Sequence, residues 1–175
     1  MHSDTRDDWN VLFTPLGAAI YAKDEESAEA LLDGGDDPNE VDDAGMNALH
    51  WAAEKGCRLP LFHRILGMIH NVNAVTTEYF GSTALMKAAA CNHLDMVVSL
   101  MNHPGIDVNV QDSFNSTALH HAVQNNLLAI VAQLLSDERI DTSIKDYTNV
   151  TPLKHAIDRV YDECAKILRE HGAPE

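Results

Sequence analysis

A short run of apolar and small residues returns five times along the chain, each time behind a residue that can cap a helix. The fourth copy reads Thr117-Ala118-Leu119-His120-His121-Ala122. In every copy a leucine and an alanine stand three residues apart, on one face of a helix, so the run predicts a short amphipathic helix. The other copies begin at Thr14, Asn47, Thr83 and Thr151, which gives steps of 33, 36, 34 and 34 residues.

A second apolar feature follows each run at a similar distance, as a pair of bulky residues that predicts a second helix. The pairs are Leu31-Leu32, Ile65-Leu66, Leu100-Met101, Leu134-Leu135 and Ile167-Leu168. One helix pair cannot bury both of its faces, so neighbouring pairs must stack. The pattern predicts an all-α solenoid of five stacked helix-turn-helix repeats.

The segments between repeats share a turn pattern, in which an acidic residue stands three positions before Gly or Asn. Gly and Asn enter the left-handed region of the backbone most cheaply. We therefore expect a projecting β-turn, here called a finger, at residues 42–46, 78–82, 112–116 and 146–150. Extra residues around 67–70 and 74–77 can displace the second finger.

The hexapeptide Thr-Pro-Leu-His-x-Ala, repeated at this period, resembles the ankyrin repeat from about Trp9 to Ala173. The resemblance implies an ankyrin-repeat solenoid whose helix pairs are joined by β-turn fingers, with repeats at about 9–41, 42–77, 78–111, 112–145 and 146–173. It also implies that His50 and His120 hydrogen-bond the loops between repeats. Asn39, Asn73 and Asn109 match the family's buried loop asparagine, and Ser143 departs from it.

The ends of the chain suggest where the stack begins and stops. Residues 1–8 are acidic and polar, so we expect a flexible lead-in before a single domain at 9–175. Trp9, Val11, Leu12 and Phe13 are expected to cap the first repeat. The polar face of the helix expected at 162–171, followed by Gly172, predicts the end of the stack.

The formal charge of −15 narrows the classes of partner. Phosphate backbones and anionic lipid surfaces both require clustered Lys and Arg, so we expect neither nucleic acid nor membrane as a partner. A protein partner, including a basic one, remains open. The three cysteines are unclustered, and the N-terminus lacks a secretory pattern. These features favour a monomer in the cytoplasm, or also in the nucleus.

Motifs for catalysis and cofactor binding are absent from the sequence. There is no phosphate-binding glycine loop, no nucleophile elbow and no His-Glu-x-x-His, so we expect no catalytic residues, no cofactor and no metal. The carboxylate pairs Asp36-Asp37 and Asp42-Asp43 are interpreted as solvated turn charges. An enzyme or metal-dependent protein is retained as an alternative, which a chelator would test.

Because the resemblance implies a protein-binding module, the finger tips are the candidate site. We expect the two residues after the acid, and the one after Gly or Asn, to point away from the stack. Four of the chain's ten aromatic residues occupy these positions. The candidate residues are Asp43, Ala44, Met46, Tyr79, Phe80, Ser82, Ser113, Phe114, Ser116, Tyr147, Thr148 and Val150, with Glu54, Cys91, Gln124 and Asp158 of the first helices as a second side.

The sequence leaves two questions about these residues open. The rings either anchor a partner or fold back onto the loop and the neighbouring repeat, and the role as adaptor, inhibitor or scaffold is undetermined. In addition, Met101 to Asn109 resembles the sequence around ankyrin asparagines that an iron- and 2-oxoglutarate-dependent oxygenase hydroxylates. Asn109 is therefore either a hydroxylation site or a residue that bonds its loop backbone.

Overall fold

The structure, a computed structural model, describes residues 12–78 and 80–175. The expected lead-in at 1–8, the capping residues Trp9 and Val11, and the candidate site residue Tyr79 lie outside the described residues.

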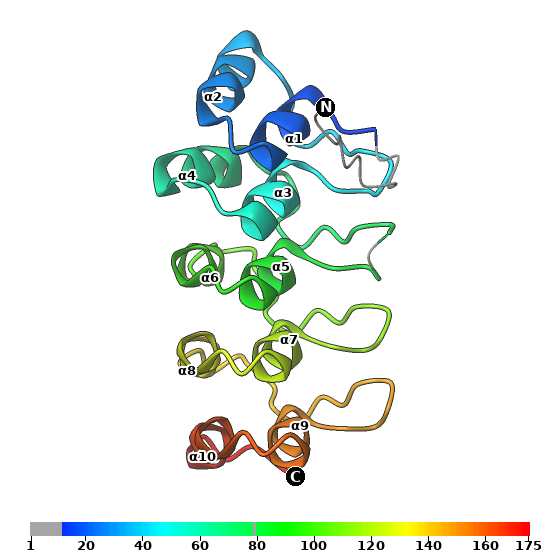
Figure 1. The fold of residues 1–175 in the computed structure, drawn as a ribbon, viewed down its shortest axis with the longest axis vertical. Coiled ribbons are helices and arrows are strands. Elements are labelled where there is room, and N and C mark those ends of the chain that lie inside the picture. Colours follow the sequence, from blue (N-terminus) through cyan, green and yellow to red (C-terminus); the bar gives the residue numbers. More distant parts are fainter. Residues whose placement is uncertain (1–11, 79) are drawn as a thin grey trace, which may run out of the picture.

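Ten helices form five consecutive pairs, and the part of the chain described contains no strand, which confirms the all-α fold class. The first helices of the pairs stack in one column and the second helices in another (Figure 1). The fingers project from the side of the first helices that faces away from the second column. The helices are α1 (Pro15–Tyr21), α2 (Glu25–Gly34), α3 (Ala48–Lys55), α4 (Leu59–Met68), α5 (Ala84–Ala90), α6 (Leu94–Met101), α7 (Ala118–Gln124), α8 (Leu128–Leu135), α9 (Pro152–Asp158) and α10 (Asp162–Glu170).

The five predicted capping residues all precede a first helix. Thr14, Asn47, Thr83 and Thr151 accept a hydrogen bond from the backbone N–H three residues later, at 3.0–3.3 Å. Thr117 is the N-cap of α7. Each cap satisfies a backbone donor that the first turn of a helix leaves free, so the repeated motif fixes where each first helix begins.

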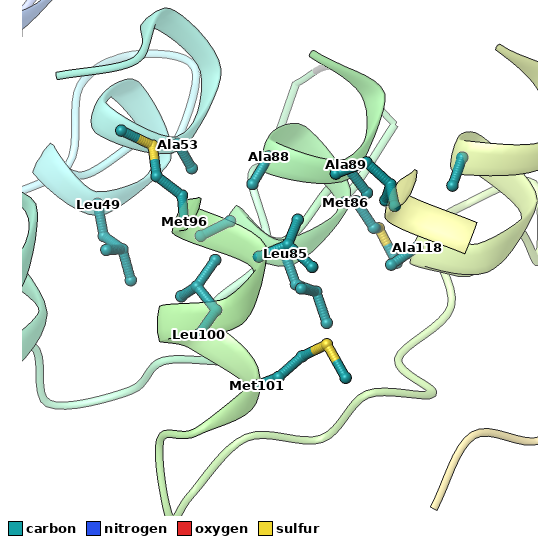
Figure 2. Packing of buried hydrophobic residues seen from close by; sticks show 14 of the residues in the cluster. Leu49, Ala53, Leu85, Met86, Ala88, Ala89, Met96, Leu100, Met101 and Ala118 are labelled. Atoms are coloured by element: carbon teal, nitrogen blue, oxygen red, sulfur yellow. The ribbon is translucent and has the colours of Figure 1, made fainter. Parts of the chain in front are cut away.

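The core runs along the seam between the two columns. In its central part Leu85 and Ala88 of α5 lie close to Leu100 of α6, with Leu49 of α3 on one side and Ala118 of α7 on the other (Figure 2). These five side chains are all buried. The small alanines allow the first helices to approach closely, and the leucines fill the space toward the second helices.

The backbone of the fingers confirms the predicted left-handed residues. Gly45, Gly81, Asn115 and Asn149 have φ angles of 71°, 73°, 55° and 65°. In the finger of repeat five, for example, the N–H of Asn149 donates to the carbonyl of Asp146 at 2.8 Å and closes a β-turn.

A substitution series at Asn149 tests this geometry. We expect Asn149→Gly to be neutral or slightly stabilising, whereas Asn149→Val should lower the free energy of unfolding by about 1–2 kcal/mol, because a β-branched residue is strained in the left-handed region. Asn115 should behave in the same way. Urea denaturation of the three proteins checks this, and equal stability of the Val and Gly variants would show that the turn is misassigned.

A second set of left-handed residues connects the two helices within each repeat. Lys23, Gly56, Asn92, Asn126 and Val160 occupy this position, with φ angles between 52° and 73°. Glycine and asparagine fit such a position well, and the turn lets the second helix fold back against the first.

Candidate protein-binding face

Each of three fingers is built around one buried aspartate. In the finger of repeat four, Asp112 Oδ1 accepts hydrogen bonds from the backbone N–H groups of Phe114 and Ser116, at 2.8 and 2.9 Å. Its Oδ2 lies 2.9 Å from Nε2 of His121 on α7. One carboxylate therefore shapes the turn and fastens it to the first helix of its own repeat.

The same arrangement recurs with different helix partners. Asp146 Oδ2 lies 2.7 Å from Nε2 of His155, and Trp51 Nε1 donates to Asp42 Oδ2 at 2.8 Å. Asp42 is buried, so its interpretation as a solvated turn charge is wrong, whereas its neighbour Asp43 is exposed. Asp42 lies inward because its carboxylate accepts from the N–H groups of Ala44 and Met46 and from Trp51.

Hydrogen bonds lower the pKa values of two finger carboxylates, Asp112 and Asp146, in spite of their burial. Burial raises the pKa of Asp146, but hydrogen bonds from Thr148, from His155 and from two backbone N–H groups outweigh it and lower the pKa to about 2. For Asp112, burial likewise raises the pKa, and the bonds from His121 and the backbone lower it below its usual value. Several donors converging on one carboxylate favour the charged form.

The remaining finger is longer and is held differently. Its closing hydrogen bond runs from Thr76 N to the carbonyl of Ser82 at 3.1 Å, so Thr76, and not Glu78, occupies the place of the finger aspartate. Thr76 Oγ1 also accepts from the N–H of Ser82 at 3.1 Å. Lys87, at the position of His121 and His155, contacts Glu54 Oε2 at 2.8 Å. The expected displacement is confirmed for the closing bond, while Glu78 begins the β-turn as expected, since its carbonyl accepts from the N–H of Gly81 at 3.4 Å.

Several residues expected at the finger tips point into the stack instead. Ala44, Met46 and Ser116 are buried, and Ser82 and Val150 are half-buried. The closing bond, for example from Asp42 N to the carbonyl of Met46 at 3.1 Å, turns the last residue of a finger back toward its helix, and the next finger bonds Ala44 through its carbonyl. Asp43, Ser113 and Thr148 are exposed as expected.

Three aromatic side chains of successive fingers form a continuous row, here called the aromatic row: Phe80, Phe114 and Tyr147. The ring centroids of Phe80 and Phe114 are 4.6 Å apart, and those of Phe114 and Tyr147 are 5.2 Å apart. Exposed fractions are 61%, 37% and 67% along the row. The rings therefore contact the neighbouring finger and still present apolar surface to solvent.

Backbone hydrogen bonds between fingers keep this row in register. Ser113 N donates to the carbonyl of Phe80, and Tyr147 N donates to the carbonyl of Phe114, both at 2.8 Å. The N–H groups of Thr77 and Glu78 both donate to the carbonyl of Ala44, at 3.0 Å. The finger tips thus form one connected edge.

The late residues of the first helices form the second side of this face. Glu54 contacts Lys55 and Lys87. Gln124 is half-buried, and its carbonyl accepts from Arg159 at 2.7 Å; Asp158 pairs with Lys154. Cys91 is the exposed C-cap of α5 and stands eight residues after the N-cap of that helix. Glu54, Gln124 and Asp158 each stand seven residues after the N-cap of their own helix.

A cluster at the N-terminal end of this side was missed from the sequence. The ring centroids of Phe13, Tyr21 and Trp51 lie 5.0–5.4 Å apart, and Lys55 Nζ is 4.4 Å from the centroid of Tyr21. Tyr21 stands seven residues after the cap Thr14, as Glu54 does after Asn47. That spacing would have identified Tyr21 as part of the face.

The loop asparagines join each repeat to the next. Asn109 Nδ2 donates to the carbonyl of Arg139 at 2.7 Å, and its Oδ1 accepts from the N–H of Asp141 at 2.9 Å. Asn39 and Asn73 bond the following loop in the same way. Ser143 bonds Asp141 within its own loop instead.

The two motif histidines also bridge repeats. His50 Nε2 lies 2.9 Å from the carbonyl of Ala74, and its Nδ1 is 3.2 Å from the N–H of Asn47. His120 makes the corresponding contacts with Val150 and Thr117. Burial lowers the pKa of each ring to about 4. Because Nε2 of each ring faces a carbonyl oxygen, the neutral ring donates at that nitrogen.

Two further properties bear on the class of site. Across residues 12–78 and 80–175, no three Cys, His, Asp or Glu side chains gather in a group that could hold a metal ion. None of the helices described has the length and apolar character that crossing a lipid bilayer requires.

The repeats, fingers and bridging residues together define a helical repeat protein, and the chain belongs to the ankyrin-repeat family. The family model described as "Ankyrin repeats (3 copies)" matches residues 16–112, 57–146 and 104–174. Ankyrin repeats are typically binding modules for proteins and not enzymes.

Among curated proteins the chain is similar to NF-kappa-B inhibitor alpha. The protein of Sus scrofa is 37% identical over 106 residues, and that of Homo sapiens is 36% identical over 114 residues. Each match covers 59% of this chain and 33% of the relative, so the chain spans about one third of the length of these relatives.

Proposed function

We propose that the chain binds a partner protein through the face formed by its finger tips and first helices. The observation that carries this proposal is the aromatic row, because three large rings exposed side by side bury far less apolar surface than they could. Clustered exposed aromatic residues are typical anchors of protein interfaces. Asp43, Ser113, Glu54, Gln124 and Asp158 supply polar positions around the row.

The charge of the chain favours a basic partner. Within residues 12–78 and 80–175, eight of the 11 Lys and Arg side chains contact carboxylates of the chain itself, namely Lys55, Arg58, Arg64, Lys87, Arg139, Lys154, Lys166 and Arg169. With 27 Asp and Glu in the sequence, the charge left for a partner is strongly negative. Such a field mainly speeds encounter with a positively charged protein, and the rate should fall as salt rises.

A double substitution in the aromatic row tests the proposed site. We expect Phe114→Ser with Tyr147→Ser to weaken binding by more than about 2 kcal/mol, the magnitude typical of interface anchors. The thermal midpoint should fall only slightly, because each lost ring contact is worth about 0.5–1.5 kcal/mol. The partner would first be captured by crosslinking to the intact chain, and its affinity then measured by calorimetry.

A matched control lies on the opposite side of the repeat stack. Lys166 and Glu163 are exposed on α10, and their replacement by Ser should leave binding unchanged. If the double variant of the aromatic row binds as tightly as the parent, the partner uses another face. If it unfolds at a much lower temperature, the rings are chiefly structural.

The similarity to NF-kappa-B inhibitor alpha supplies a first partner to try. We propose NF-kappa-B as a candidate on the basis of that name and of the shared repeats. Retention of purified NF-kappa-B on the immobilised chain would favour the role of inhibitor over adaptor or scaffold. No retention at micromolar concentration would exclude this candidate and leave the partner to the crosslinking experiment.

We propose a monomer that acts in the cytoplasm, or also in the nucleus, without enzymatic activity or cofactor. Hydroxylation of Asn109 stays a prediction, and the two loop bonds of its amide favour the structural role. Peptide mass spectrometry of the protein purified from cells tests it, since an unmodified peptide containing Asn109 would exclude the role as oxygenase substrate.

A further inference from the structure

Two histidines on neighbouring first helices have one ring nitrogen bonded and the other free. His121 of α7 and His155 of α9 stand one repeat apart at the same place in the motif. Nε2 of each ring lies against a buried finger carboxylate, at 2.9 Å from Asp112 Oδ2 and 2.7 Å from Asp146 Oδ2. Within residues 12–78 and 80–175, Nδ1 of neither ring has a hydrogen-bond partner.

These free nitrogens are open to solvent. The exposed fraction of the side chain is 25% for His121 and 16% for His155. In the part of the chain described, no side-chain nitrogen or oxygen is both buried and without a partner, so Nδ1 of each ring reaches the surface. The motif histidines His50 and His120 differ, because both of their ring nitrogens are bonded.

The finger carboxylates decide which ring nitrogen carries the proton. Burial raises the pKa of Asp112 and of Asp146, but hydrogen bonds outweigh it, and the pKa of Asp146 falls to about 2. An ionised carboxylate can only accept, so Nε2 of the neutral ring donates and Nδ1 keeps its lone pair. Each Asp–His pair therefore carries one negative charge and offers an acceptor at the surface.

The two Asp–His pairs lie on one surface, next to the aromatic row. The N–H of Tyr147 donates to the carbonyl of Phe114 at 2.8 Å and joins the two fingers whose aspartates hold the rings. Helices α7 and α9, which carry the rings, are neighbours in the column of first helices (Figure 1). The ring centroid of His155 is 6.1 Å from that of His120, the residue before His121.

The first three repeats fill the same position without such an acceptor. In repeat two Trp51 donates to Asp42 through Nε1, its one side-chain nitrogen. Lys87 of repeat three is a donor, and Ala18 of repeat one is apolar. The acceptors are therefore confined to repeats four and five.

The surroundings favour a cation that carries several donors. Gln124 and Asp158 follow the two histidines by three residues, on the same face of each helix, and add oxygen acceptors. The cations nearby are already engaged, since Lys154 pairs with Asp158 and Arg159 donates to the carbonyl of Gln124, both at 2.7 Å. A guanidinium group has five donors in a planar fork, so it can bond a ring nitrogen and a neighbouring oxygen together.

We propose that His121 and His155 accept hydrogen bonds at Nδ1 from arginine side chains of the partner protein. This rests on the proposed function and names the chemistry of the partner at repeats four and five. The charge of a guanidinium complements that of the carboxylate behind each ring. The partner segment then places arginines beside the apolar residues that cover the aromatic row.

The test uses the chain labelled with ¹⁵N at histidine and the probe peptide acetyl-Gly-Arg-Gly-Arg-Gly-amide. In the free chain at pH 7.5, the ring spectra should show His121 and His155 with the proton on Nε2. The peptide should shift the Nδ1 signals of these two rings. Counterpart peptides with lysine, or with uncharged citrulline, should bind at least about tenfold more weakly, because they lack the fork or the charge.

An isosteric exchange of the two aspartates reverses the acceptor. In Asp112→Asn with Asp146→Asn, each amide oxygen keeps the backbone bonds of its finger, and the amide nitrogen donates to Nε2. The ring proton then moves to Nδ1, and the arginine peptide should bind at least about tenfold more weakly, because donor faces donor. Glu163→Gln with Glu170→Gln removes the same charge from exposed positions of α10 and should bind as the parent does.

The spectra of the parent chain decide the inference even if the asparagine variant does not fold. A proton on Nδ1 in the free chain, unshifted Nδ1 signals with the arginine peptide, or equal affinity for the lysine peptide would overturn it. The proposed face has its own test in Phe114→Ser with Tyr147→Ser. If that variant loses the captured partner while the arginine peptide leaves both rings unshifted, the face is supported and this inference is wrong.

Discussion

Lowering the pH from 7.5 to 4.5 is expected to reduce the free energy of unfolding by several kcal/mol, mainly through two buried histidines. His50 and His120 are almost fully buried, and burial holds the pKa of each at about 4, against 6.5 for an exposed ring. Each pKa unit corresponds to about 1.4 kcal/mol, so each ring accounts for about 2–3 kcal/mol at pH 4.5.

The direction follows from where the protons bind. Between pH 6.5 and 4 the unfolded chain protonates both rings and the folded chain does not, so acid favours unfolding. Above pH 6.5 neither state binds these protons, and stability should be flat with respect to these two rings. The finger carboxylates Asp112 and Asp146 act in a lower window, because their lowered pKa values give stability that is lost only as the pH falls below about 4.

Repeat three offers a matched control, since Met86 stands at the histidine position and its Sδ accepts from Thr83 N at 3.4 Å. The variant His50→Met with His120→Met should be less stable at pH 7.5, because the bonds to Ala74 and Val150 are lost. Its urea midpoint should then change little between pH 6.5 and 4.5. A slope equal to that of the parent would show that other groups cause the acid sensitivity.

Replacing Asp42 by Ala is expected to lower the free energy of unfolding by about 3 kcal/mol. Asp42 Oδ1 accepts from the N–H groups of Ala44 and Met46 at 2.9 Å, and Oδ2 accepts from Trp51. Alanine would leave these three donors without a partner in a buried position, and each such donor costs about 1–3 kcal/mol where solvent cannot reach it.

The adjacent residue supplies the control for this substitution. Asp43→Ala removes the same carboxylate from an exposed position, and we expect a change within about 0.5 kcal/mol. Urea denaturation of both variants at pH 7.5 gives the comparison. Equal losses for Asp42→Ala and Asp43→Ala would contradict the structural role of the buried carboxylate.

The start of each first helix and the left-handed residues of the fingers could be predicted because they depend on local chemistry. Thr14, Asn47, Thr83, Thr117 and Thr151 all act as caps, since a side-chain oxygen at that position suits any helix start. Gly45 and Asn149 have positive φ for a similarly local reason.

What the sequence could not show depends on contacts between segments. Met46 and Ser116 lie inside because a cross-finger hydrogen bond turns the chain back, and local pattern carries no signal for that bond. Thr76 takes the place of the finger aspartate because two additional residues lengthen that finger, which the repeat pattern does not show. In both cases tertiary context overrides the repeat pattern.

The aromatic row illustrates the limit most clearly for the candidate site. The sequence placed Phe80, Phe114 and Tyr147 at finger tips, and their exposure is confirmed. Their mutual contact was not predictable. Tyr147 is the first residue after its finger aspartate and Phe114 is the second, so the two rings meet diagonally. Whether these rings contact a partner stays a prediction.

Hydrogen–deuterium exchange of the chain with its captured partner tests the central claim most directly. The account predicts new protection in the fingers at 42–46, 76–82, 112–116 and 146–150 and at the C-terminal ends of the first helices. Exchange in the second helices, including α8 and α10, should stay unchanged. Protection confined to the second helices, with the fingers unaffected, would contradict the proposed binding face.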